Sequence, residues 1–131
     1  MRILAIDIGT GTQDILLFDS TVAPENCFKM VMPSPTAILA AKVRRATARG
    51  QEIFLAGAMM GGGPVNWAIT DHLKRGLVVF ATRDAARTID DDLSKVAAMG
   101  VVVLDHDDED LVRRALRLDL KDLDLAAINR A

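Results

Sequence analysis

The sequence predicts an α/β domain with a mixed sheet, in which three antiparallel strands come first and parallel strands follow with helices on their faces. Three strand-like segments fall within the first 33 residues, and the links between them are too short for helices. Strands joined in this way pair antiparallel. After that point strand-like runs alternate with helical patterns, which is typical of a parallel sheet. The 131 residues are the usual size of one domain, and half of them are hydrophobic.

The first half of the chain has a local signal for each expected element. We expect strands over residues 1–8, 14–19 and 26–32. The first of these is mostly apolar, as expected for a strand that is covered on both faces. A helix is expected to begin at Ser34, a good N-cap residue, and to stop at Gly50, because glycine commonly ends helices.

The second half continues the alternation. We expect strands over residues 52–58, 77–81, 101–104 and 116–120, and helices over 64–75, 82–89, 90–100, from Asp108, and from Asp122 or Asp124. The last helix reaches Ala131 without a glycine, a proline or a polar tail. We therefore expect residues 1–131 to be a single N-terminal lobe whose second lobe is missing from this chain.

Composition narrows the range of partners and cofactors. The formal net charge of −2 provides no basic field for nucleic acid or an anionic membrane. The uncharged stretch over residues 53–70 is broken by glycines and a proline, so we expect no membrane span and a cytoplasmic protein. Cys27 is the single cysteine, which excludes a disulfide, a cysteine-ligated zinc or an iron–sulfur cluster formed within this chain. We expect it to be a small buried hydrophobe.

The first candidate site is the turn between the first two strands, which contains Gly9, Thr10, Gly11 and Thr12. Glycines allow the backbone to come close to a ligand, and successive amides form a concave anion site. Asp7, at the end of the first strand, could hold a magnesium ion through water, because magnesium prefers few carboxylates and many waters. These features predict a phosphate-binding hairpin with a metal beside it.

Two other nucleotide-binding motifs fit this turn poorly, and a hairpin without a ligand is a simpler explanation. A dinucleotide fingerprint would need a third glycine and a following helix, whereas here a strand follows. A P-loop would need Gly-Lys-Thr or Gly-Lys-Ser, and neither occurs in the sequence. An ordinary glycine hairpin with no ligand remains the structural alternative.

The second candidate site is the run Gly61, Gly62 and Gly63, between a strand and a helix N-terminus. The free amides and the dipole of a helix start attract anions, and ligands usually bind at the carboxyl ends of parallel strands. A tight connection that lets the helix pack closely on the sheet explains the glycines equally well. We expect Met59 and Met60, just before this run, to be core filler.

Several charged groups also suggest sites but have simpler explanations. Arg83 could grip a carboxylate or phosphate, although a surface ion pair is favoured. Residues 90–92 are three aspartates that resemble a metal cluster, yet acidic residues commonly begin helices. Residues 105–108, Asp-His-Asp-Asp, also resemble metal ligands, and a cap after a strand is the favoured interpretation.

Two basic features need no functional role. His72 is expected beside a helix C-terminus, where a cation is favourable. Lys42, Arg45 and Arg49 share one helical face, for which we expect a solvated surface.

A family resemblance adds to this picture. The segment D-I-G-T-G-T, followed by a second and a third strand, resembles the first phosphate motif of the actin-like ATPase superfamily, which includes sugar kinases, acetate kinases and the 70-kDa heat-shock chaperones. The resemblance implies a ribonuclease H-like first lobe that binds ATP with Mg²⁺. It also implies that Asp7 organises the metal and that the loop from Gly9 to Thr12 contacts nucleotide phosphates.

A narrower resemblance covers nearly the whole chain. The segments R-I-L-A-I-D-I-G-T-G-T-Q-D-I-L-L-F-D, M-M-G-G-G-P and R-D-A-A-R-T-I-D-D-D look like an uncharacterised, mainly archaeal family of unknown function, DUF1786. Its members are sometimes labelled as resembling a pyruvate formate-lyase activating enzyme. Such radical enzymes need three closely spaced cysteines, which these residues do not contain.

Together these patterns predict the phosphate-binding lobe of an ATPase or small-molecule kinase. The alternative is a non-enzymatic module that senses a ligand or binds another protein. Actin has a lysine seven positions after its metal aspartate, where this chain has Asp14, and no catalytic base can be assigned without a second lobe. The expected partners are a nucleotide, that second lobe, and other copies of the chain through an exposed apolar surface.

Overall fold

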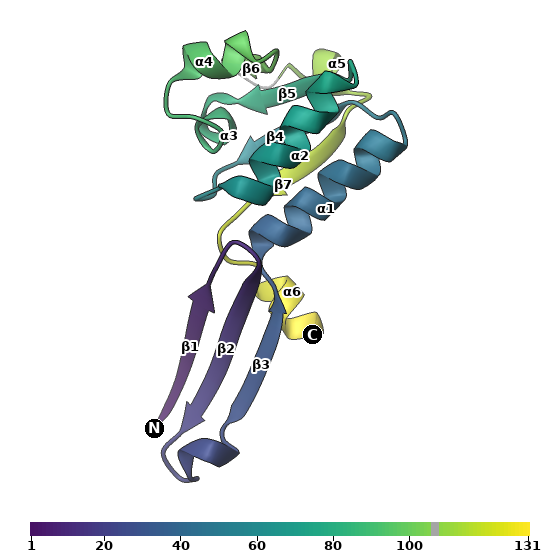
Figure 1. The fold of residues 1–131 in the computed structure, drawn as a ribbon. Helices are drawn as coiled ribbons and strands as arrows, with labels where there is room; N and C mark the ends of the chain where they lie inside the picture. Colours follow the sequence, from purple (N-terminus) through teal and green to yellow (C-terminus); the bar gives the residue numbers. More distant parts are fainter. Residues whose placement is uncertain (106–107) are drawn as a thin grey trace.

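The computed structural model describes residues 1–105 and 108–131, and these form two separate β-sheets (Figure 1). The first sheet contains β1 (Arg2–Ile8), β2 (Thr12–Asp19) and β3 (Phe28–Pro33), with β2 in the middle and both pairings antiparallel. A short 3-10 turn, η1 (Pro24–Asn26), joins β2 to β3. The predicted antiparallel trio is therefore confirmed.

The second sheet is entirely parallel and has the strand order β6-β5-β4-β7. Its strands are β4 (Ile53–Gly57), β5 (Val79–Thr82), β6 (Val102–Leu104) and β7 (Leu116–Leu120). The prediction of one mixed sheet is wrong in this respect. A mixed sheet would need one of the first three strands beside the parallel ones, but among the described residues β1, β2 and β3 pair only with one another, and β5 and β7 flank β4.

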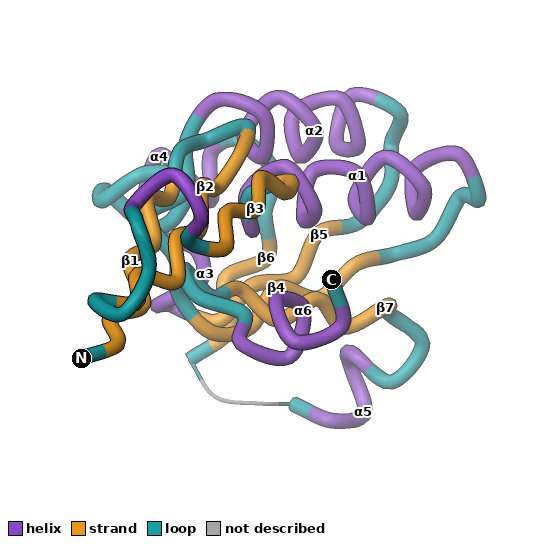
Figure 2. The backbone as a smooth tube through the Cα atoms, turned by 90° about the horizontal axis from the view of Figure 1, so that it is seen from below, coloured by secondary structure: helices purple, strands orange, loops and turns teal. Residues whose placement is uncertain are grey.

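Helices pack on both faces of the parallel sheet. The six helices of the described residues are α1 (Pro35–Ala48), α2 (Gly63–Lys74), α3 (Arg83–Arg87), α4 (Leu93–Ala98), α5 (Glu109–Val112) and α6 (Leu125–Arg130). Figure 2 shows α1 and α2 on one side of the parallel strands and α5 on the other. The main core lies between the sheet and the two long helices, and Ile53, Val43 and Ile69 are fully buried there. None of the helices in the described part of the chain is long and apolar enough to cross a membrane.

Side-chain caps set several helix starts. The Ser34 hydroxyl accepts a hydrogen bond from the Ala37 amide at 3.2 Å, as expected for the predicted N-cap of α1. Asp124 rather than Asp122 caps α6. In α4 the cap is Asp92 and not Asp90, because Asp90 accepts a hydrogen bond from the Asp92 amide and forms the turn before the helix.

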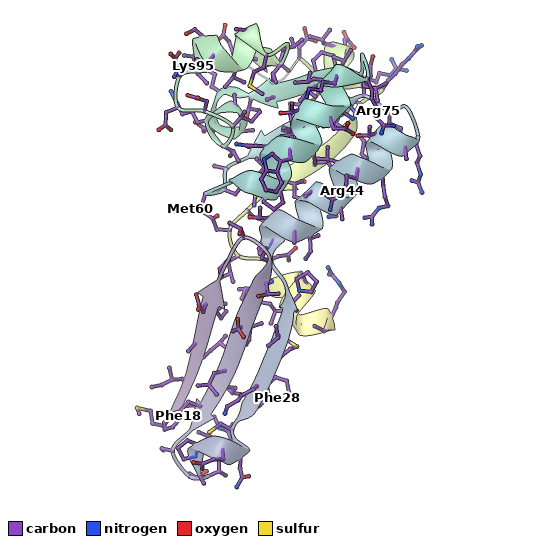
Figure 3. All side chains as sticks on the ribbon, in the orientation of Figure 1. Phe18, Phe28, Arg44, Met60, Arg75 and Lys95 are labelled. Atoms are coloured by element: carbon purple, nitrogen blue, oxygen red, sulfur yellow. The ribbon has the colours of Figure 1, made fainter. Side chains whose placement is uncertain are left out.

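The three-stranded sheet projects away from the rest of the molecule (Figure 1). Large apolar side chains are exposed on both of its faces: Leu4 (51%) and Phe28 (59%) on one, Ile3 (46%) and Val31 (64%) on the other. In Figure 3, Phe18 and Phe28 lie at the far end of this sheet. The expectation that the first strand is covered on both faces is therefore wrong, since six of the seven residues of β1 are exposed.

Candidate functional site

The two predicted glycine turns come together at the junction between the two sheets. They border one hollow of about 410 Å³, which is lined by Ile8, Gly9, Thr10, Thr36, Met60, Gly61 and Asp122. Met60 lies at this junction, above the turn of the β1–β2 hairpin (Figure 3). The contact is close, because a Cβ added to Gly62 would lie 3.9 Å from the Thr10 methyl carbon. Tertiary structure thus combines two loops that are about 50 residues apart in sequence into one site.

The first turn provides free backbone donors. Its Gly9 amide is already used, because it donates to the Thr12 carbonyl at 2.9 Å. Within the described residues the amides of Thr10 and Gly11 donate to no protein acceptor. A Cβ on Gly11 would meet nothing within 4 Å, and neither Gly9 nor Gly11 has a positive φ. Strain or crowding within the protein therefore gives no reason for glycine at position 11, and its role stays a prediction.

The second turn has a different conformation, and here glycine is required by the fold. Gly61 and Gly62 have φ values of +72° and +114°, which side-chain-bearing residues rarely adopt. A Cβ on Gly61 would lie 2.6 Å from the Thr88 carbonyl oxygen. Gly62 is the N-cap of α2 and has no side chain to satisfy the first amides of the helix. Pro64 has no amide hydrogen and the Val65 amide donates to the Gly62 carbonyl at 3.1 Å, so among these first residues the Gly63 amide is the one left for an anion, in line with the helix dipole.

Asp122 is a residue of the hollow that sequence reasoning missed as a site residue. Its Oδ1 atom accepts a hydrogen bond of 2.7 Å from the Met60 amide, so it holds the loop between β4 and α2 from a position 62 residues further along the chain. In the sequence it looked only like a helix start. No local pattern reveals this contact, because the parallel pairing of β7 with β4 brings the two segments together.

The carboxylate predicted to hold magnesium points elsewhere. Asp7 lines a separate hollow of about 400 Å³ on a face of the three-stranded sheet, together with Asp14, which is directly opposite in register. Ile8 borders the glycine hollow, and alternate residues of a strand point to opposite faces. Asp7 is therefore not among the residues that line the space between the glycine turns. Among the described residues, no three His, Cys, Asp or Glu side chains are grouped as metal ligands.

The two methionines before the second turn differ from each other. Met59 is 8% exposed and belongs to the main core, as predicted. Met60 is 89% exposed, so the prediction that it fills the core is wrong. The strand has ended by this point, and the chain turns across the surface toward α2.

The simpler explanations hold for Arg83 and Asp108. Arg83 pairs with Asp105 at 2.9 Å, which confirms an exposed ion pair and leaves its charge largely satisfied. Asp108 caps α5 by accepting a hydrogen bond from the Leu111 amide at 3.1 Å. The middle of the predicted 105–108 group, residues 106 and 107, lies outside the described residues.

His72 is not a surface cation. It is fully buried between α1 and α2, with its Nδ1 atom 2.8 Å from the Thr47 hydroxyl oxygen. Burial lowers the pKa of His72, an effect only partly opposed by the Val78 carbonyl and the charge of Asp71. His72 lies in the last turn of α2, as predicted, but its lowered pKa favours the neutral imidazole, so it adds no cation to the helix C-terminus. Cys27, in contrast, is buried as predicted, and its sulfur accepts a hydrogen bond from the Asp19 amide.

One known protein family matches the second half of the chain. The family model described as "Putative pyruvate format-lyase activating enzyme (DUF1786)" matches residues 60–131. The chain belongs to this family. The match to DUF1786 begins at the second glycine turn and includes Asp122, so it contains one side of the hollow. Searches of curated proteins and of solved structures gave no match.

Proposed function

We propose that this chain is the nucleotide phosphate-binding lobe of an actin-like ATPase or small-molecule kinase. The observation that carries the proposal is the meeting of two glycine turns around one hollow beside the start of α2. Phosphoryl groups are bound in this way by backbone amides, with no need for a basic side chain. Four of the lining residues belong to these two turns or to the loop leading into them, and Thr36 adds a hydroxyl from the first turn of α1.

The chemistry of the hollow suits the phosphate end of a nucleotide. The Thr10 and Gly11 amides are available on one side and the Gly63 amide at the start of α2 on the other. Asp122 brings a negative charge to the rim and already occupies the Met60 amide. Because a carboxylate and a phosphate accept the same kind of hydrogen bond, Asp122 takes the Met60 amide that an anion would otherwise use, and a phosphate would have to be bound by the remaining amides.

Asp7 and Asp14 do not line the space between the turns. Asp7 and Asp14 together could hold a hydrated Mg²⁺, since this ion prefers one or two carboxylates. They line the other hollow, however, so we assign no step to an ion at this position. The role of Asp7 remains a prediction. If Asp7 holds a metal, Asp7→Asn should remove the part of nucleotide affinity that depends on Mg²⁺ and leave the affinity in EDTA unchanged.

The test uses the 131-residue chain and a fluorescent ADP analogue, with inorganic triphosphate as competitor. Gly11→Val should weaken binding at least tenfold if the Gly11 amide contacts phosphate, because the valine would stand beside that amide, while a Cβ there meets no protein atom within 4 Å and the fold should tolerate it. Ala48→Val, an exposed change at the far end of α1, is the control and should leave the affinity unchanged. Equal affinity of Gly11→Val and the unaltered chain, with both folded by circular dichroism, would sink the phosphate assignment.

Catalysis is expected only from a more complete site. Phosphoryl transfer needs the transferred group to be surrounded by donors and charge, and this open hollow contacts it from a limited set of directions. We therefore expect the 131-residue chain to bind nucleotide weakly and to release no phosphate. Steady ATP hydrolysis by the purified chain, abolished by Asp7→Ala, would refute this view.

One observation favours a second candidate, a non-enzymatic interaction module. The three-stranded sheet exposes large apolar side chains on both faces, which is unusual for a surface that contacts only water. In that function nucleotide binding would alter partner contacts without turnover. A longer form of the protein that binds ATP but transfers no phosphate to water or small acceptors would support this alternative. The radical chemistry in the family description requires cysteines that these 131 residues do not have.

A further inference from the structure

The outer edge of the parallel sheet contains an open strand beside a basic helix. In the part of the chain that the structure describes, β7 pairs with no strand except β4, so its other side is a free edge. Beside this edge is a hollow of about 290 Å³, which we call the α1–β7 groove; it is lined by Lys42, Arg45, Ala46, Arg49, Gln51, Leu116, Arg117 and Leu118. The groove lies at the amino ends of β4 and β7, away from the glycine turns at the carboxyl end of β4.

The backbone of β7 has unused hydrogen-bonding groups in this groove. The Leu116 amide donates to the Glu52 carbonyl at 2.8 Å, so this residue faces the neighbouring strand. In a parallel ladder, alternate residues face alternate sides, which directs the backbone groups of Arg117 and Asp119 to the free edge. An open row of this kind is a template for an added strand.

The side chains of these two edge residues lie on the far face of the sheet. The Arg117 guanidinium lies over the Phe54 ring, 5.4 Å from its centroid, and pairs with Asp119 at 3.0 Å. Phe54 belongs to the core cluster on the α5 side of the sheet, not to the cluster under α1. The Asp119 carboxylate is thus satisfied on that side and does not neutralise the cations of α1.

The wall of the groove is positively charged. Lys42, Arg45 and Arg49 are exposed, and within the described residues none of them has a carboxylate within 4.0 Å. The helix dipole accounts for basic residues in the last turn, Arg45 and Arg49, but not for Lys42, two turns earlier. The chain as a whole is acidic, so this basic wall is a local feature. A solvated helix face, as expected from sequence, does not account for its alignment with an open strand edge.

We propose that the α1–β7 groove binds an extended acidic segment of a partner protein, which adds as a strand to the free edge of β7. The three cations are spaced by about 4.5 and 6 Å along the helix axis. Alternate residues of a strand are about 6.6 Å apart, so acidic residues at every second position would meet them. The backbone supplies the pairing and the cations select acidic side chains. This inference is independent of nucleotide binding, because the groove lies at the amino ends of β4 and β7 and the glycine turns lie at their carboxyl ends.

The experiment measures binding of a labelled eight-residue peptide of alternating glutamate and valine by fluorescence anisotropy. The triple variant K42Q/R45Q/R49Q should weaken binding at least tenfold. Arg44→Gln is the matched control, because Arg44 is on the same helix but outside the groove, and it should change affinity less than twofold. Absence of binding to the unaltered chain, or equal losses in both variants, would overturn the proposal.

A second arm separates strand addition from simple charge attraction. Two peptides are compared, one N-methylated at its odd positions and the other at its even positions, because only one of these sets of amides can face β7. Binding should be lost for one peptide and retained for the other, while equal binding of both would refute strand pairing. Sedimentation velocity tests whether a second copy of the chain occupies the groove. If the chain forms a dimer and the peptide dissociates it, the occupant is a second copy and the assignment to an acidic partner is overturned.

Discussion

Replacing Gly61 by alanine should destabilise the protein more than any substitution at a glycine that lies in open space. Gly61 has a φ of +72°, and an alanine in this left-handed region costs about 1–2 kcal/mol. The added Cβ would also lie 2.6 Å from the Thr88 carbonyl oxygen. Backbone atoms cannot rotate away as a side chain can, so relief of this overlap should add about 1–3 kcal/mol.

Gly50 provides the matched comparison. Its φ of +65° is nearly the same, but a Cβ there would meet no atom within 4 Å. Gly50→Ala should therefore show the conformational cost alone, about 1–2 kcal/mol. The difference between the two variants isolates the contact of the second glycine turn with Thr88.

Urea unfolding followed by circular dichroism gives the measurement. With an m-value of about 2 kcal/mol/M, the additional cost at Gly61 should lower the midpoint by about 0.5–1.5 M relative to Gly50→Ala. The slopes should agree, because neither change alters the surface exposed on unfolding. If the two alanine variants unfold at the same urea concentration, Gly61 is not packed against Thr88, and the loop geometry described for the hollow is wrong.

Three further predictions follow from individual contacts. The pKa of buried His72 is lowered, so below about pH 6.5 the unfolded chain binds a proton that the folded chain does not. The free energy of unfolding should therefore fall with falling pH, by at most about 1.4 kcal/mol per pH unit. In urea titrations between about pH 5 and 6.5, His72→Gln should lack this slope. Asp122→Ala should speed hydrogen exchange of the Met60 amide, whereas Asp122→Asn keeps an acceptor and should not; equal exchange rates in all three proteins would show that this hydrogen bond does not hold the loop. The chain should self-associate through its three-stranded sheet, and Phe28→Lys should shift sedimentation toward monomer, whereas the control Trp67→Lys, at a more exposed aromatic on α2, should not. A monomer at every concentration up to about 1 mM would contradict this prediction.

The order and type of the secondary elements could be predicted from the sequence, because their signals are local. The Ser34 cap, the glycine that ends α1 and the β-branched run of β6 each act within a few residues. Predicted and observed helix starts differ where two nearby residues could both cap the helix. Asp90 and Asp92 can both cap a helix, and the choice depends on which turn the backbone makes before α4.

The candidate site could be predicted only in part. Both glycine turns were evident, because glycines directly after a strand indicate a tight turn of the backbone. Three relations were not evident: the meeting of the two turns, the approach of Asp122 to the Met60 amide, and the direction of Asp7 away from the hollow. These relations join residues that are distant in sequence, and alternation along β1 turns adjacent side chains to opposite faces.

The sequence by itself determined the local structure of this protein: its strands, its helices, most of its helix caps and its two glycine turns. Tertiary structure alone decided that the strands form two sheets, because strand pairing depends on which edges remain open after the helices have packed. β7 took the place beside β4 through long-range hydrogen bonds that no local pattern specifies. That pairing left the first three strands as a separate exposed sheet and brought Asp122 to the glycine turn.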